Sequence, residues 1–305
     1  MFASKLAAAV LLLLCAANCV KSTLITISPN CTNKDTECCS LSKLYVHSTW
    51  SLKVSSNTTI LILNGVQSMT SDIVIRDVDN VTLQFEENSQ IHCIERAELV
   101  FMNITNLQIF GLTLNNCGAE INESLAAEAL YVQTETVLKI KKGLQAAIFA
   151  VNIRRFQMDH SVINGSHGYG FLGINIIGES SVANTLINSS NTNSMTDYCM
   201  TPRLTPSQAA ECFGGNALFV YNDFPTCPES ELFYTLSILN SIFSHGFDPI
   251  GGFQDYISRG CGLGIIMSQK FYNVGVNLVN STFTMNTARS YGSNLYIRLI
   301  IAETN

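Results

Sequence analysis

Two carboxylates stand two residues apart in the phrase Arg76-Asp77-Val78-Asp79, and in this chain they are the pair best suited to bind a cation. Carboxylates that alternate along a loop can ligate calcium. Aspartates also form turns, because their side chains bond to nearby backbone, and here a strand is expected to begin at Val81. We favour the turn and keep Asp77 and Asp79 as weak calcium candidates.

The other polar groups that could do chemistry are scattered. Asp159 precedes His160, and Asp248, Asp255 and Arg259 share a later segment, but the sequence gives none of them a second partner. The cysteines lack C-x-x-C spacing and the histidines show no ligand pattern, so we expect no metal site. No phosphate loop, dinucleotide fingerprint or nucleophile elbow occurs, and we expect no cofactor.

The composition excludes one class of partner. Of the 305 residues only 13% are charged, the net charge is −6, and no basic patch is visible. Nucleic acid binding requires such a patch, so we expect no nucleic acid partner. Asn, Ser and Thr must keep the surface soluble.

The N-terminus predicts secretion. Residues 1–22 hold a lysine, an apolar run from Leu6 to Ala17 and then small residues, which is the pattern of a signal peptide cleaved between Asn18 and Ser22. A buried helix is the alternative, but nothing amphipathic accompanies the run. No later stretch approaches the ~20 apolar residues of a membrane span.

Sequons and cysteines agree with an extracellular protein. Eight Asn-X-Ser/Thr sequons predict glycosylation. They stand at Asn30, Asn57, Asn80, Asn103, Asn122, Asn164, Asn188 and Asn280. Without Cys15 and Cys19 of the signal, nine cysteines remain. Because nine is odd, one thiol is free, pairs with another chain, or has its partner outside this chain.

A repeat organises the chain. Residues 147–192 superimpose on themselves after a shift of 24, which places Ile148 on Leu172 and Ile163 on Ile187. The phrase Asn-[Ser/Thr]-x-[Ile/Phe] recurs at Asn240 and Asn280, after longer and unequal intervals. A fixed period indicates stacked units that bury their apolar rows against neighbours. We assign the extra residues to loop insertions near 191–215, 222–233 and 246–261.

Earlier segments carry the same pattern. Val81–Phe85 alternates apolar and polar residues, as a strand with one buried face does, and Leu107–Leu114 reads as another strand. Asn80 and Asn106 open similar phrases at nearly the same period. The segment from Ala119 to Lys142 is irregular, and we assign it one degenerate coil plus a loop.

These features predict an all-β fold, a parallel β-helix with coils of about 24 residues over 57–305. Leucine-rich repeats need the consensus L-x-x-L-x-L-x-x-N, and a two-sheet sandwich would show no fixed offset. Residues 23–56 form a cysteine-bearing cap, in which Ser40–Val46 is either a short capping helix or a loop tied by disulfides. Cys93 and Cys117 are separated by one period, so we expect a disulfide rather than two buried thiols.

The phrases themselves resemble a known superfamily. NTTILILNG at 57–65, NVTLQF, IHC, NLQIFGLTLNNCG at 106–118 and the N-S-x-F coils are similar to the pectin-lyase-like right-handed β-helix proteins, above all to secreted animal proteins with a right-handed β-helix domain. The resemblance spans the whole mature chain and implies a right-handed fold.

The resemblance also raises two enzymatic chemistries. Polygalacturonase-like members use NTD and DD carboxylates, a Ser-His-Gly histidine and an RIK motif. Here only Ser-His-Gly occurs, at His167 and His245, with Asn191-Thr192-Asn193 as the nearest relic of NTD. Glycoside hydrolysis needs two positioned carboxylates. Pectate-lyase-like members use calcium and an arginine base, for which Arg76 and the two nearby aspartates are the nearest match.

We therefore expect a secreted, glycosylated, non-catalytic β-helix module that acts as an extracellular structural or glycan- or protein-binding surface. The alternative is a polysaccharide lyase or glycoside hydrolase on acidic glycans, with Asp77, Asp79 and His167 as weak catalytic candidates. After the strand Leu295–Ile301 the chain stops without a cap, so we expect either another chain at this end or a longer protein that could carry a membrane anchor.

Overall fold

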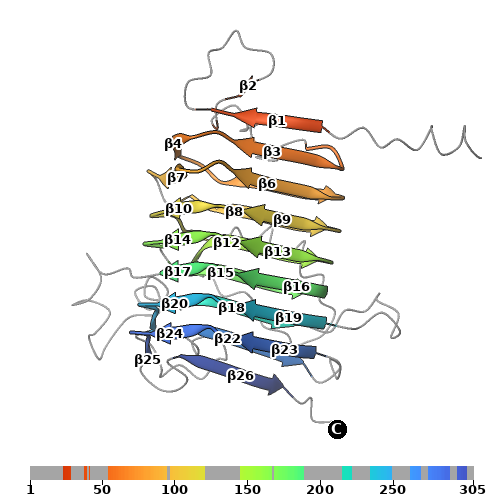
Figure 1. Cartoon of the computed structure of the whole chain (residues 1–305). Helices are drawn as coiled ribbons and strands as arrows, with labels where there is room; N and C mark the ends of the chain where they lie inside the picture. The colour runs from red at the N-terminus through yellow and green to blue at the C-terminus, as the bar shows by residue number, and fades with distance from the viewer. Residues whose placement is uncertain are drawn as a thin grey trace, which may run out of the picture.

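The chain is a right-handed parallel β-helix in which three long sheets run side by side along one axis (Figure 1). The computed structural model describes residues 23–28, 38–39, 41, 54–94, 97–120, 145–166, 168–188, 215–221, 234–248, 262–268, 274–288 and 294–300. Each coil adds one strand to the eight-stranded sheet, then one to the nine-stranded sheet, then one to the seven-stranded sheet. No described residue lies in an α-helix, and so no helix here has the length and hydropathy of a membrane span.

The nine-stranded sheet runs in the order β2-β1-β3-β6-β9-β13-β16-β19-β23. Its strands are β1 (Thr23–Ile27), β2 (Cys38–Cys39), β3 (Thr58–Ile62), β6 (Val81–Phe85), β9 (Leu107–Phe110), β13 (Phe156–Asp159), β16 (Gly178–Ala183), β19 (Tyr234–Leu239) and β23 (Val274–Val279). The segment assigned to a cap therefore contributes β1, which pairs with β3 in parallel register.

The other two sheets complete the coil. The seven-stranded sheet holds β4 (Gly65–Met69), β7 (Ser89–Cys93), β10 (Thr113–Asn115), β14 (Val162–Asn164), β17 (Leu186–Asn188), β20 (Ile242–Ser244) and β24 (Thr282–Thr284). The eight-stranded sheet holds β5 (Ile73–Val78), β8 (Leu99–Ile104), β12 (Gln145–Ile153), β15 (Tyr169–Ile176), β18 (Gly215–Tyr221), β22 (Leu263–Ser268) and β26 (Leu295–Ile300), and β11 (Ala119–Glu120) pairs with β12 antiparallel. A small separate pair joins β21 (Phe247–Asp248) to β25 (Thr287–Ala288).

The period expected for the central coils holds in two sheets and fails in the third. Ile163 pairs with Ile187, as expected, but Phe149 rather than Ile148 pairs with Leu172, which shortens the step by one residue. The missing residue reappears at the next corner, where three residues, 177–179, stand in place of the two residues 154–155 of the preceding coil, and Gly178 adopts a left-handed φ of 73°. A Cβ atom at Gly178 would lie 2.6 Å from the Arg154 carbonyl oxygen, so this extra residue requires glycine.

Two sequence predictions about the early coils are wrong. Leu107–Leu114 is two strands, β9 and β10, because Gly111 turns the chain with φ of 70°. No degenerate coil is interposed at 119–142, because β12, β13 and β14 pair directly with β8, β9 and β10. That segment is therefore an insertion into one coil.

Several predictions fall on residues outside the described ranges. These are the signal peptide, most of the possible capping helix at Ser40–Val46, and most of the loop insertions near 191–215, 222–233 and 246–261. Leu41, the described residue of the possible helix, is buried. The sheets are continuous across all three insertions, since β15 pairs with β18, β16 with β19, and β18 with β22.

The core consists of like residues stacked coil on coil. One such column on the inner face of the nine-stranded sheet is Ile60, Leu83, Ile109, Met158, Val182 and Ile238. Phenylalanines stack on the inside of the later coils, with ring centroids of Phe156 and Phe171 5.0 Å apart and those of Phe171 and Phe219 5.2 Å apart. Burial of these columns is the main favourable term in the stability of the coils.

The predicted disulfide is present. Cys93 and Cys117 are bonded with a Cα separation of 5.0 Å, and both are buried. The register differs from the expectation, because Asn115 pairs with His92, so the cysteines are diagonal and not direct neighbours. Asn116, at φ of 55°, turns the chain between them.

Candidate functional site

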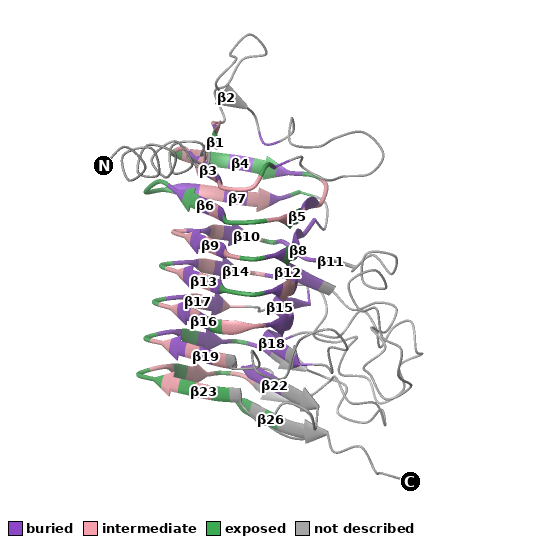
Figure 2. Ribbon diagram, turned by 90° about the vertical axis from the view of Figure 1, so that its right-hand side faces the viewer, coloured by how far each residue is buried: buried purple, intermediate pink, exposed green. Residues whose placement is uncertain are grey.

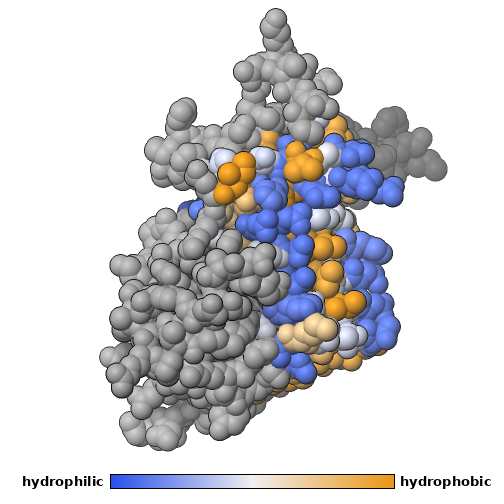
Figure 3. Space-filling view, turned by 90° about the vertical axis from the view of Figure 1, so that its left-hand side faces the viewer, coloured by the Kyte–Doolittle hydropathy of each residue, from blue (hydrophilic) through white to orange (hydrophobic). Residues whose placement is uncertain are grey.

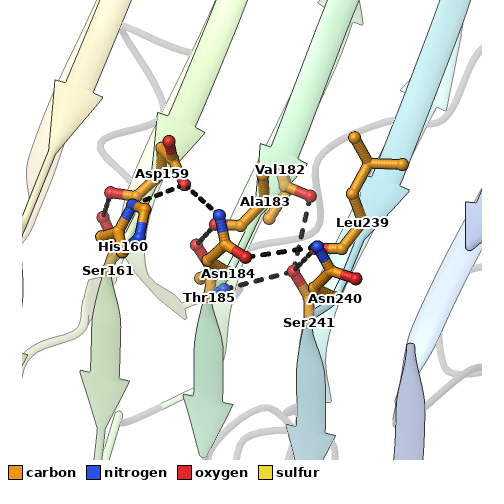
Figure 4. Close-up of polar contacts among 10 residues, drawn as sticks. All are labelled: Asp159, His160, Ser161, Val182, Ala183, Asn184, Thr185, Leu239, Asn240 and Ser241. Atoms are coloured by element: carbon orange, nitrogen blue, oxygen red, sulfur yellow. Dashed lines mark hydrogen bonds and ion pairs between the residues drawn. The ribbon is translucent and has the colours of Figure 1, made fainter. Parts of the chain in front are cut away.

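The corner between the nine- and seven-stranded sheets carries a ladder of carboxamides (Figure 4). Nδ2 of Asn184 donates to Oδ1 of Asp159 at 2.9 Å, Nδ2 of Asn240 donates to Oδ1 of Asn184 at 3.3 Å, and Nδ2 of Asn280 donates to Oδ1 of Asn240 at 3.0 Å. The three asparagines have φ between 47° and 49°, the left-handed region that asparagine tolerates better than most residues. We call Asp159, Asn184, Asn240 and Asn280 the long corner ladder.

The residue after each of these left-handed positions carries a second line of bonds. The hydroxyls of Thr185 and Ser241 donate to the carbonyls of Ala183 and Leu239, at 2.7 and 2.9 Å, and the backbone N–H of Thr185 donates to the Ser241 hydroxyl at 3.2 Å (Figure 4). In each phrase the third residue, such as Leu186, faces outward, and the fourth, such as Ile187, lies in the core. This geometry explains the recurring phrase Asn-[Ser/Thr]-x-[Ile/Phe].

His160 occupies the ladder position in its own coil, with φ of 49°. Its Nδ1 lies 2.9 Å from Oδ1 of Asp159, the same carboxylate oxygen that accepts from Asn184. The Asp159–His160 pair therefore has the second partner that the sequence did not identify. Its imidazole is exposed.

A second ladder lies between the eight- and nine-stranded sheets and contains Asp77. It runs through Asn103, Asn152 and Asn175, with donor–acceptor distances of 2.8, 3.1 and 3.3 Å. Arg76 also donates to Asp77, at 2.7 Å. Partial burial raises the pKa of Asp77, but the hydrogen bonds from Arg76 and Asn103 and the Arg76 charge outweigh it, so the pKa is lowered.

Asp79 is engaged by other residues. Its carboxylate accepts from the Thr105 hydroxyl and its backbone N–H donates to Ser56 at 3.0 Å. The carboxylates of the two calcium candidates, Asp77 and Asp79, are thus hydrogen-bonded to different side chains. Among the residues that the structure describes, no three His, Cys, Asp or Glu side chains gather at one point.

The two Ser-His-Gly copies are not equivalent. His167 lies outside the described residues. His245 turns the corner after β20 with φ of 54°, and the register of β14, β17 and β20 aligns it with Gly165 and not with His167. Asp248 lies in β21, whereas Asp255, Arg259 and the Asn191–Asn193 relic lie beyond the described part of the chain.

The outer face of the nine-stranded sheet carries an unbroken row of uncharged hydrogen-bonding side chains, which we call the polar row. Its seven members are Thr59, Thr82, Gln108, Gln157, Ser181, Ser237 and Asn277, each in register with the next. Some bond to each other, as Thr82 does to Gln108 at 3.3 Å and Asn277 to Ser237 at 3.4 Å. All are half-buried or exposed.

A second row runs beside it on the same face, and we call it the mixed row. Its members in register are Leu61, Gln84, Phe110, Asp159, Ala183, Leu239 and Val279. Five of these seven are apolar and Asp159 is the one ionisable member. The face therefore presents a polar stripe and a largely apolar stripe, with rungs spaced by about 4.8 Å.

The outer face of the seven-stranded sheet is also striped. Figure 3 shows an apolar column on this side of the molecule between hydrophilic columns. Val162, Leu186 and Ile242 are in register on this face, and Ile242 is 44% exposed. The row of Asn164 and Asn188 flanks them, with Nδ2 of Asn188 donating to Oδ1 of Asn164 at 3.2 Å.

The structure adds a carboxyl pair that the sequence analysis missed. Glu98 is 1% exposed, its Oε2 has no hydrogen-bond partner, and its backbone N–H donates to Oδ1 of Asp72 at 3.0 Å. Burial, with the charge of Asp72 added, raises the pKa of Glu98 well above its usual range, and burial also raises the pKa of Asp72. The signal in the sequence is a glutamate directly before the apolar strand β8. Because Glu98 is enclosed, it cannot contact a ligand outside the coil.

The sequon asparagines coincide with the ladders. All six that the structure describes share a side-chain hydrogen bond with a neighbouring coil. They are Asn57, Asn80, Asn103, Asn164, Asn188 and Asn280. The fold therefore gives these asparagines a role of their own, and Asn30 and Asn122 lie outside the described ranges.

Comparison with family models, with curated protein sequences and with solved structures finds no match for this chain.

Proposed function

We propose that this protein is a secreted, glycosylated and non-catalytic β-helix module of the pectin-lyase-like kind, and that the outer face of its nine-stranded sheet binds an extended, uncharged glycan. The observation that carries the proposal is the polar row, seven uncharged side chains in register on consecutive coils. A rigid row with a constant spacing suits a linear polymer more than a compact ligand.

The two stripes fit the chemistry of a sugar chain. A pyranose ring has hydroxyls at its edge and an apolar face of C–H groups. The polar row offers amide and hydroxyl donors and acceptors to the edge, and Leu61, Phe110 and Leu239 of the mixed row offer apolar surface to the ring face. The polar row itself carries no charge, so it offers an acidic glycan no ion pair along its length.

The test is a binding assay on insoluble neutral polysaccharides, such as cellulose, chitin and a β-1,3-glucan, with pectate and alginate as acidic counterparts. We expect binding to a neutral polymer, and a loss of about tenfold or more for Gln157→Glu or Phe110→Ala, since one buried polar or apolar contact is worth roughly 1–2 kcal/mol. The matched control is Thr113→Glu, which adds the same charge to the seven-stranded sheet and is expected to leave binding unchanged.

Three results would contradict the proposal. Equal weakening by Thr113→Glu would mean that binding is unspecific. Absence of binding to every polymer would leave a structural role. Turnover of an acidic polysaccharide, lost in Asp77→Asn or His167→Ala or on removal of calcium, would favour the enzyme instead.

A further inference from the structure

The six described sequon asparagines fall into two groups by the direction of their ladder bond. Four donate their Nδ2 to the preceding coil, namely Asn80 to Asn57 at 2.8 Å, Asn103 to Asp77 at 2.8 Å, Asn188 to Asn164 at 3.2 Å and Asn280 to Asn240 at 3.0 Å. The other two, Asn57 and Asn164, accept through Oδ1. Nδ2 is the atom that an N-linked glycan modifies.

We propose that Asn57 and Asn164 carry the N-linked glycans of the described coils and that the four donor asparagines stay unmodified. The inference rests on secretion, which is part of the proposed function. It selects two of six sites that the sequence motif alone does not distinguish.

The modification changes one atom of the ladder. In glycosyl transfer the amide nitrogen forms a bond to the anomeric carbon of a lipid-pyrophosphate-linked oligosaccharide. The bond between that carbon and the pyrophosphate breaks, the lipid pyrophosphate leaves, and one amide proton passes to a base of the transferase. The nitrogen keeps one hydrogen and gains a bulky substituent.

A donor nitrogen in a ladder has one of its two hydrogens directed at a neighbouring oxygen, so only the other can be replaced without loss of the bond. Its neighbour's oxygen lies at 2.8–3.2 Å, and adjacent rungs are about 4.8 Å apart. Asn103 is the most extensively bonded of the four, because it donates to Asp77 and also accepts from Asn152 at 3.1 Å. A chain that receives a glycan at such a site before folding must keep its remaining N–H directed at the neighbouring rung, a restriction that the two accepting asparagines do not have.

Two pairs of sequon asparagines are bonded to each other, and within each pair only one member donates its nitrogen. Asn57 with Asn80 and Asn164 with Asn188 are sequons on directly adjacent rungs, so glycans on both members would stand one rung apart. In each pair the member that only accepts keeps its nitrogen outside the ladder bond. Asn164 is exposed on the seven-stranded sheet, and Asn57 is half-buried at an early coil. Glycans there leave the polar row open from Gln108 to Asn277.

The experiment maps site occupancy in the full chain secreted from eukaryotic cells. Enzymatic deglycosylation in heavy-oxygen water marks each formerly glycosylated asparagine, and peptide mass spectrometry reads the marks. We expect them at Asn57 and Asn164 and not at the four donors. Thr59→Ala and Ser166→Ala, which remove these two sequons but keep the asparagines, should each lose one glycan-sized mobility step.

Thr82→Ala and Thr282→Ala are the matched controls, because they remove the sequons of Asn80 and Asn280, and we expect no step. A mark of comparable occupancy at any donor, or a step lost in either control, would overturn the inference. Protein that reaches the medium with none of the six marked would overturn it and leave secretion intact. Protein that stays in the cell without glycans would overturn both.

Discussion

The eight- and nine-stranded sheets are built by the same coils and differ in what their outer faces meet. Outward residues of the eight-stranded sheet, such as Val100, Phe149 and Leu172, are at most 1% exposed, although they lie outside the main core cluster. Outward residues of the nine-stranded sheet are half-buried or exposed. Figure 2 shows the contrast in colour, with β12, β15 and β18 buried and β16, β19 and β23 mixed.

The sequences of the strands already differ in the same way. Strands buried on both faces read as continuous apolar runs, as AAIFAV does in β12, whereas VTLQF in β6 alternates. Every long insertion of the later coils begins or ends next to a strand of the eight-stranded sheet. The outer face of the eight-stranded sheet is therefore packed, whereas the outer face of the nine-stranded sheet is open to solvent and ligands.

The largest expected effect tests the buried face. Phe149→Ala should lower the free energy of unfolding by about 3–5 kcal/mol, the cost of truncating an enclosed phenylalanine. Urea denaturation followed by circular dichroism measures it. A loss below about 1 kcal/mol would mean that this outer face is a surface, and the contrast between the two sheets would disappear.

A substitution in the long corner ladder should lower the free energy of unfolding by less. Asn240→Ala removes the bonds to Asn184 and Asn280 and places alanine at φ of 48°, so we expect a loss of about 1–2 kcal/mol. Asn240→Gly tolerates the left-handed backbone and isolates the loss of the side-chain bonds, about 0.5–1.5 kcal/mol. If the two variants are equally stable, backbone strain contributes nothing at this corner.

The burial of Glu98, directly before β8 of the eight-stranded sheet, predicts that the free energy of unfolding depends on pH. Its pKa is raised in the folded chain, so between the ordinary and the raised pKa the folded state binds more protons than the unfolded state, and stability falls as pH rises through that window. Glu98→Gln cannot ionise and removes this slope. Relative to the parent, it should gain stability as pH rises above the ordinary pKa of a glutamate side chain. Parallel stability curves for both proteins would show that the carboxyl is solvated.

The smallest expected effect lies on the polar row. Gln157→Ala should change the free energy of unfolding by no more than about 0.5 kcal/mol, because its side chain faces outward. The same variant is expected to weaken glycan binding. Stability and binding would then separate on this face, whereas a loss as large as that of Phe149→Ala would assign the row to packing.

The sequence predicted the coil but not its corners. Like apolar residues recur at a fixed offset because they stack in columns, and so Ile163 and Ile187 reveal the fold. A corner depends on which residue enters the left-handed region, which is a local choice with little signature in hydrophobicity. Gly111 therefore appeared to lie inside one strand, and the one residue gained at the corner that contains Gly178 shifted the predicted register by one.

The site was harder to predict for a physical reason. Asp77 and Asp79 attract attention because they are charged and close in sequence, but each is bonded to a residue about one coil away. The polar row consists of single Thr, Gln, Ser and Asn residues spaced by whole coils, and none is conspicuous in its own segment. Only the register of the strands brings Gln108 and Gln157, which are distant in sequence, side by side.

From β9 onward, two residues always connect a strand of the nine-stranded sheet to the next strand of the seven-stranded sheet, and in four of these five coils they are an Asn or His followed by a Ser or Thr. Because this two-residue link is constant, each coil places its strand of the seven-stranded sheet at the same position relative to its strand of the nine-stranded sheet. A coil can more than double in length elsewhere, as the one between Asn184 and Asn240 does. The strands on either side of the insertion still pair in register. Such a chain can acquire new loops one coil at a time while the rows on its open face keep their alignment.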